Sequence, residues 1–296
     1  MQRLSQVERG LSDFEEGWLC GFIEGEGSFI TGGINRPYFS LAQKNVEILR
    51  HIQTMLGFGT VQPLRYLHLP GYGRYGAYSK SDTYTIANLL LGRLKLKRKQ
   101  MQFSRWLNAM LKCHWPVPTD PKPVTKEFNE GWIVGFSEAE GMFWNNKDGR
   151  PIFRITQVRH RYIFEWIRKF LGFGYVNIHW RKNHSWHYIV SNPNDRSKIA
   201  AFFKGRLKHP DVIASFNLWV QTFENDHPIR VKGRAYTRDR YSIRHADPIW
   251  RANINAYLRE WRKRKQSDPI WVEHRRVEHR RAYERWRERK QLKLYR

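Results

Sequence analysis

The chain has 296 residues and carries 53 Lys+Arg against 27 Asp+Glu, a formal net charge of +26 at pH 7. Such an excess predicts a polyanionic partner, either a nucleic acid or an anionic membrane surface. No apolar run approaches the ~18 residues of a membrane span, and the opening MQRLSQVERGLSDFEE resembles neither a secretory signal nor a transit peptide. We therefore expect an intracellular protein, organellar or bacterial, that is not secreted. Cys20 and Cys113 are the two cysteines, so neither disulfides nor a cysteine-based zinc site is expected.

The first predicted element is a helix over residues 14–25, which Ser12 and Glu15 can start with a capping box. A hairpin turning at Gly32-Gly33 follows, and then a helix that places Val46, Leu49, Ile52 and Leu56 on one face. Helical segments end this half near Trp106. The predicted hairpin covers 28–43, the second helix 46–56, and two further strands 60–67 and 77–86.

The chain then contains the same segment again. Residues 14–29 (FEEGWLCGFIEGEGSF) and 128–143 (FNEGWIVGFSEAEGMF) are identical at ten of 16 positions, at a constant offset of 114. We therefore predict a tandem duplication. Its parts are a first repeat at 12–115, a stiff proline-rich linker at 116–126 and a second repeat at 127–226. The second repeat's expected strands are 152–158, 175–180 and 186–190, with a helix at 163–171.

A basic tail follows at residues 228–296, with 22 Lys+Arg against 8 Asp+Glu. The segment Asp247-Pro248-Ile249-Trp250 recurs as Asp268-Pro269-Ile270-Trp271. Asp-Pro starts helices well, so the pattern predicts two basic helices carrying Trp and Tyr. Added grip on phosphate and a merely solvated charged tail both remain open for this segment.

Small residues stand four apart in both copies of the repeated helix: Gly17, Gly21 and Gly25, then Gly131, Gly135 and Ala139. Each glycine inside a helix costs ~1 kcal/mol relative to alanine, so the stripe predicts close approach of another backbone, most simply the other copy's. Glu26 and Glu140 end these helices, where the helix dipole disfavours an anion. A divalent cation would relieve two such carboxylates, and oxygen ligands favour Mg²⁺. Glu24 and Glu138 repeat as well, and we expect them to be structural and to point away from the small-residue stripe.

Leu19–Gly27 (LCGFIEGEG) and Ile133–Gly141 (IVGFSEAEG) resemble the nine-residue motif of the LAGLIDADG homing endonucleases, in the pattern of single-chain members with two motifs. The resemblance covers roughly residues 12–226 and leaves the tail unexplained. It implies an α+β fold of tandem αββαββα repeats related by a pseudo-two-fold axis, with antiparallel sheets forming a saddle over the DNA major groove. It also implies Mg²⁺-dependent cleavage of both strands at a long recognition site, leaving 3′ overhangs.

On this resemblance, Glu26 and Glu140 are metal-binding, together with the preceding Gly25 and Ala139. Gln43, Gln157 and Lys99 are expected to support catalysis near the scissile phosphates, with Lys97 as the alternative to Lys99. The second repeat departs from the pattern, because Val212 aligns with Lys99 and Pro210 with Lys97. Slower cutting of one strand and cutting of one strand alone are both consistent with this departure.

Strand residues are expected to read DNA, since a two-stranded ribbon fits the major groove. The predicted DNA-binding residues are Arg36, Arg65, Tyr66, His68, Arg74, Tyr75, Lys80, Arg150, Arg154, His179, Arg181, Lys182 and His184. The leading hypothesis is a monomeric, intron-encoded, site-specific double-strand endonuclease that binds duplex DNA. An RNA-binding maturase acting on intron RNA and a catalytically silent DNA-binding protein are the alternatives; retention of both Glu26 and Glu140 argues against the last.

Overall fold

The computed structural model describes residues 10–31, 36–63, 72–146, 149–180 and 184–224, with isolated residues of the C-terminal segment. Two repeats of the same architecture make up the main part. In the first, the elements are α1 (Asp13–Glu26), β1 (Gly27–Ile30), β2 (Tyr38–Gln43), α2 (Val46–Leu56), β3 (Thr60–Pro63), β4 (Gly73–Ala77), α3 (Lys80–Leu90) and α4 (Lys97–Lys112). In the second they are α5 (Lys126–Glu140), β5 (Gly141–Asn145), β6 (Pro151–Val158), α6 (Arg161–Leu171), β7 (Tyr175–Trp180), β8 (Ser185–Val190), α7 (Pro193–Phe203) and α8 (Pro210–Glu224).

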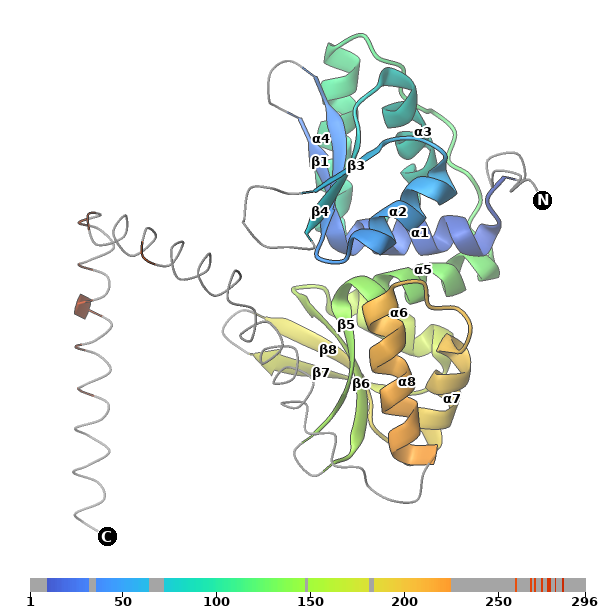
Figure 1. The fold of residues 1–296 in the computed structure, drawn as a ribbon, viewed down its shortest axis with the longest axis vertical. Helices are drawn as coiled ribbons and strands as arrows, with labels where there is room; N and C mark the ends of the chain where they lie inside the picture. The colour runs from blue at the N-terminus through green and yellow to red at the C-terminus, as the bar shows by residue number, and fades with distance from the viewer. Residues whose placement is uncertain are drawn as a thin grey trace. The chain divides into compact units, whose positions relative to one another are not determined.

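Each repeat holds one four-stranded antiparallel sheet, in the orders β1-β2-β4-β3 and β5-β6-β8-β7. The strand register is also duplicated: Gly27 pairs with Leu41, and Gly141 pairs with Ile155. The repeat's helices cover one face of its sheet (Figure 1). The expected α+β fold with two antiparallel sheets is confirmed. None of the helices in the described ranges combines the length and hydropathy needed to cross a bilayer.

The local sequence accounts for these elements. The capping box at the start of α1 is present, since the Ser12 side chain accepts from the Glu15 backbone while the Glu15 carboxylate accepts in return. The helices α2 and α6 both end at a glycine in the left-handed region, Gly57 (φ 77°) and Gly172 (φ 79°), which only a residue without Cβ adopts readily. The final helix of each repeat packs an aromatic pair onto its own sheet. Phe103 and Trp106 contact Phe29, and Phe216 and Trp219 contact Phe143.

One predicted strand is wrong. Residues 77–86 were expected to be a strand, but β4 ends at Ala77 and α3 begins at Lys80. The Ser79 hydroxyl accepts a hydrogen bond from the Asp82 backbone N–H at 3.0 Å and caps this helix. Thr83, Ile86, Ala87 and Leu90 are buried at helical spacing, which overrides the strand propensity of the segment. Residues 64–67, the turn at Gly32-Gly33 and the predicted tail helices lie outside the described residues.

The two repeats meet through α1 and α5, which lie side by side between the sheets (Figure 1). A Cβ placed on Gly21 would lie 2.1 Å from the Trp132 carbonyl oxygen, and one on Gly135 would lie 2.0 Å from the Trp18 carbonyl oxygen. Gly17 and Gly131 meet the carbonyl oxygens of Phe128 and Phe14 in the same reciprocal way. These contacts follow a pseudo-two-fold relation. The expected close approach of the two helix backbones is therefore present.

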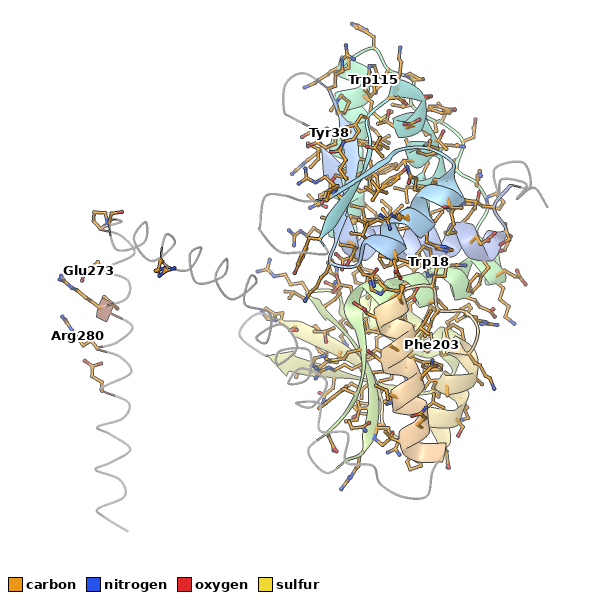
Figure 2. All side chains as sticks on the ribbon, viewed as in Figure 1. Trp18, Tyr38, Trp115, Phe203, Glu273 and Arg280 are labelled. Atoms are coloured by element: carbon orange, nitrogen blue, oxygen red, sulfur yellow. The ribbon has the colours of Figure 1, made fainter. Side chains whose placement is uncertain are left out.

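Two buried glutamates add a reciprocal pair of bonds across this seam. The Trp18 Nε1–H donates to the Glu138 carboxylate, and the Trp132 Nε1–H donates to the Glu24 carboxylate at 2.7 Å. Trp18 lies where the two halves meet (Figure 2). Each carboxylate also accepts two backbone N–H bonds from the start of its own repeat's last helix, at positions 95–96 and 208–209. Their structural role is as expected, but the expectation that they point away from the seam is wrong, because both bond across it.

Candidate active site at the ends of α1 and α5

Glu26 and Glu140 are the last residues of α1 and α5, and the stripe of small residues brings these ends together. A Cβ built on Gly25 would lie 2.4 Å from the Ala139 Cβ and 3.6 Å from the Glu140 Oε1. The two carboxyl groups therefore share one location, although they are 114 residues apart in sequence. Their neighbours Gly25 and Ala139 form the last contact of the seam.

The electrostatics of this pair are unfavourable to two anions. Burial and the nearby Glu26 carboxylate together raise the pKa of Glu140 to about 7, against a hydrogen bond from Gln157 and the charge of Lys99, which lower it. Burial also raises the pKa of Glu26, against a hydrogen bond from Gln43 and the charge of Lys99. A cation between the two carboxylates would favour their ionised forms.

The two glutamines come from corresponding strand ends. Gln43 ends β2 and Gln157 lies at the penultimate position of β6, on the same strand face as the core residues Leu41 and Ile155. Because α1 and α5 end against these strands, each amide reaches its own repeat's glutamate. The structure thus brings both predicted glutamines to the carboxylate pair.

Lys99 also reaches this location. Its Nζ donates to the Gly27 carbonyl oxygen at 2.7 Å, directly after Glu26. Burial lowers the pKa of this ammonium, and the charges of Glu24, Glu140 and Glu26 raise it. Lys97, the alternative, instead places its Nζ over the Tyr162 ring at 5.9 Å. A cavity of roughly 770 Å³ opens beside the pair, lined by Glu26, Lys99, Glu140 and Gln157 among others.

The donor set fits a hard divalent cation. In the described part of the chain, no cluster of three or more His, Cys, Asp and Glu side chains is arranged around a common point. Two carboxylates beside an open cavity are instead a sparse oxygen set, and Mg²⁺ is typically held by one or two carboxylates, water and substrate phosphate. Glu26 and Glu140 are the residues that would hold the ion, with the main chain of Gly25 and Ala139 adjoining them.

The predicted DNA-binding residues have mixed outcomes. Arg74 is exposed on β4, and Arg154 is half-buried on β6; both alternate with core residues and so lie on the face of their sheet opposite the helices. Arg36, Arg150 and His184 lie at strand ends and are exposed. Arg65, Tyr66, His68, Arg181, Lys182 and the side chain of His179 lie outside the described residues.

Two of these residues do not lie where the sequence analysis expected them. Tyr75 is fully buried and its hydroxyl donates to the Phe58 carbonyl oxygen at 3.2 Å, because its position on β4 faces the helices. Lys80 was expected on a strand but is the first residue of helix α3. The sheet faces opposite the helices also carry exposed polar residues that the sequence analysis missed, Gln62 on β3 and Asn177 on β7. Their strict alternation with apolar neighbours was the pattern that could have revealed them.

Comparison with known proteins supports the same interpretation. The family model described as LAGLIDADG endonuclease matches residues 133–223. A Neurospora crassa protein named probable intron-encoded endonuclease 4 is 27% identical over 223 residues, which cover 70% of this chain and 39% of that protein. Both matches make this chain similar to LAGLIDADG endonucleases. The chain spans well under half the length of this curated relative.

Solved LAGLIDADG structures share the fold. The meganuclease I-AabMI bound to uncleaved DNA has a TM-score of 0.57 at 16% identity, covering 71% of this chain and 90% of that one. I-SmaMI bound to uncleavable DNA has a TM-score of 0.55 at 18% identity, covering 77% and 97%. The homing endonuclease I-LtrWI bound to target DNA has a TM-score of 0.54 at 17% identity, covering 74% and 93%. These likenesses show that the described part of this chain shares the fold of those structures.

Proposed function

We propose that this chain is a homing endonuclease that makes site-specific, metal-dependent double-strand breaks in duplex DNA, and that an intron encodes it. The observation that carries the proposal is the shared location of Glu26 and Glu140, held by the contact of Gly25 with Ala139. The match of residues 133–223 to the LAGLIDADG endonuclease model, the +26 charge and the relative named as a probable endonuclease support it. An RNA-binding maturase would use the charge equally well, but it gives no reason for two acids at one point.

The chemistry required is hydrolysis of a phosphodiester in each strand. A water oxygen bonds to phosphorus, one P–O ester bond breaks, and the leaving sugar oxygen takes a proton. A bound Mg²⁺ would supply Lewis acidity toward the phosphate and would favour ionisation of a bound water. Glu26 and Glu140 would hold that ion, and Gln43 and Gln157 orient the two carboxylates by hydrogen bonds. Lys99 places a cation where negative charge develops on the phosphate.

DNA binding is assigned to the sheet faces opposite the helices. Arg74 and Arg154 lie there, with the exposed ends of the strands carrying Arg36, Arg150 and His184. Arg154 lies 5.3 Å from the Trp144 ring centroid, so its guanidinium is held on the sheet surface. We propose that the protein acts as a monomer, because the duplication supplies both halves of the site in one chain.

The test is cleavage of a plasmid carrying the uninterrupted insertion site, with Mg²⁺ and with EDTA. We expect linear product only with the metal, and loss of double-strand cutting in Glu26→Gln and in Glu140→Gln. Glu127→Gln is the matched control, since Glu127 is an exposed residue of the first turn of α5. Undiminished cutting by both site variants would refute the assignment of the site. Intron RNA binding without any DNA cleavage would favour the maturase.

A further inference from the structure

The two repeats can be aligned at their last helices by hydrogen bonds as well as by sequence. Glu24 accepts from the backbone N–H groups of residues 95–96, and Glu138 accepts from those of residues 208–209, an offset of 113. The same offset pairs Lys99 with Val212 and Arg98 with Asp211. Where α4 brings two cations to the site, α8 therefore brings an apolar residue and an anion.

The cap residues of α2 and α6, Asn45 and His160, also differ between the two repeats. Asn45 caps α2, since its Oδ1 accepts from the Glu47 backbone N–H at 2.9 Å, and its Nδ2 donates to the Asp211 carboxylate at 3.4 Å. His160 occupies the corresponding cap position of α6 but makes no side-chain capping bond. The residue is 9% exposed, and its Nδ1 has no hydrogen-bond partner among the described residues. His160 lines the cavity beside Glu140 and Lys99.

The second repeat also has one more residue in this connection. Two residues separate Gln43 from α2, while three separate Gln157 from α6. The first repeat consequently has no counterpart for Arg159, which adopts φ 64°, a conformation that side-chain-bearing residues rarely take. Its backbone N–H donates to the His184 carbonyl oxygen at 2.8 Å, which holds this conformation. The strained residue lines the same cavity as His160.

The two sides of the carboxylate pair are thus unequal in charge. Arg98, Lys99, Arg159 and His160 surround the cavity on one side. On the other side the corresponding positions hold Asp211, Val212 and Asn45, where Lys44 is the neighbouring cation. Guanidinium, ammonium and imidazole groups lining one cavity can donate to the oxygens of a phosphate, and a charged donor strengthens each such bond. The difference between Lys99 and Val212 is thus one part of a wider charge difference between the two halves.

We propose that Arg159 and His160 bind the scissile phosphate on the Lys99 side, and that the protein cuts that strand first and the other strand in a separate, slower step. This inference rests on the proposed nuclease function. It assigns two phosphate-binding residues to one strand alone. The nicked duplex is then an intermediate that accumulates, because the second phosphate meets Asp211 and Val212 instead of two cations.

The experiment measures both strands separately under single-turnover conditions. A duplex containing the uninterrupted insertion site carries a different fluorophore on each 5′ end, and products are resolved on a denaturing gel after Mg²⁺ is added. We expect one strand to be cut at least ten-fold faster. His160→Asn should slow that strand about ten-fold and leave the other unchanged. It installs the residue that caps α2 in the first repeat, so the fold is retained, which a melting temperature checks. His114→Asn, an exposed residue beyond α4, is the control.

A gain-of-function variant tests the other side. Asp211→Arg with Val212→Lys should speed the slow strand and leave the fast strand unchanged. Absence of metal-dependent cutting on both strands would overturn the nuclease proposal itself. Cutting of both strands at equal rates would leave the nuclease standing and overturn the ordered scheme. An effect of His160→Asn on both strands, or on neither, would remove His160 from a strand-specific phosphate site.

Discussion

Gly25→Ala is the most informative single change at the seam, because the structure also supplies its remedy. The new Cβ would lie 2.4 Å from the Ala139 Cβ, where ordinary contact begins at 3.4 Å. The helices must therefore separate locally by about 1 Å. Overpacking of this kind costs ~1–3 kcal/mol, offset by ~1 kcal/mol from replacing glycine in a helix. We expect a net loss of about 0–2 kcal/mol in the free energy of unfolding.

Combining Gly25→Ala with Ala139→Gly moves the methyl group from one helix to the other. The two helix-propensity terms cancel, and the remaining approach of 3.3 Å to the Glu140 Cγ needs a shift of a few tenths of an ångström. Ala139→Gly alone costs ~1 kcal/mol. Urea unfolding of the four proteins should therefore give a coupling energy of about 1–3 kcal/mol, with the double variant near the parent. Additive single effects would show that these two positions are not in contact.

Three further changes test other parts of the structure. Gly21→Ala should lower stability more than Gly25→Ala, and no side-chain change should rescue it, because its Cβ would meet the Trp132 carbonyl oxygen. Soluble yield and melting temperature measure this loss. A stable variant would contradict the backbone contact. Trp18→Phe removes one donor from the buried Glu138 carboxylate and should cost ~1–3 kcal/mol in urea unfolding, whereas an unchanged midpoint would deny the bond. Tyr75→Phe should lower the free energy of unfolding by ~1 kcal/mol and leave DNA affinity unchanged. A large loss of affinity would show that Tyr75 contacts DNA after all.

The seam was predictable because its cause is local. Glycine in the middle of a helix lowers helix stability, so Gly17, Gly21 and Gly25 predicted close approach of another backbone. The duplication indicated that this backbone is the equivalent helix of the other repeat. The two glutamates followed from their place at the end of that stripe. Alternating and helical apolar spacing gave most of the strands and helices, and Gly57 and Gly172 marked the ends of α2 and α6.

Other features depend on tertiary contacts that sequence spacing does not record. Tyr75 is of a residue type that can contact DNA. Only the pairing of β4 with β2 and β3 shows that its side chain lies on the buried face. The segment after Ala77 is rich in Tyr, Thr and Ile, which favour strands, yet burial against the sheet selects a helix. His160 and Arg159 come next to α4 only through the docking of the repeats, so their separation in sequence hid them.

The backbone-to-backbone contact at the seam has a consequence for the spacing of the two cuts. Where side chains separate two helices, a substitution or a change of rotamer can alter the distance between whatever the helices carry. At Gly21 and Gly135 no side chain intervenes, so direct contact between the two backbones sets the distance between the two acidic ends. For the proposed nuclease, the number of base pairs between the nicks is then a constant of the scaffold. Residues on the outer strands can change, and with them the DNA sequence that is recognised, while the offset between the two cuts stays the same.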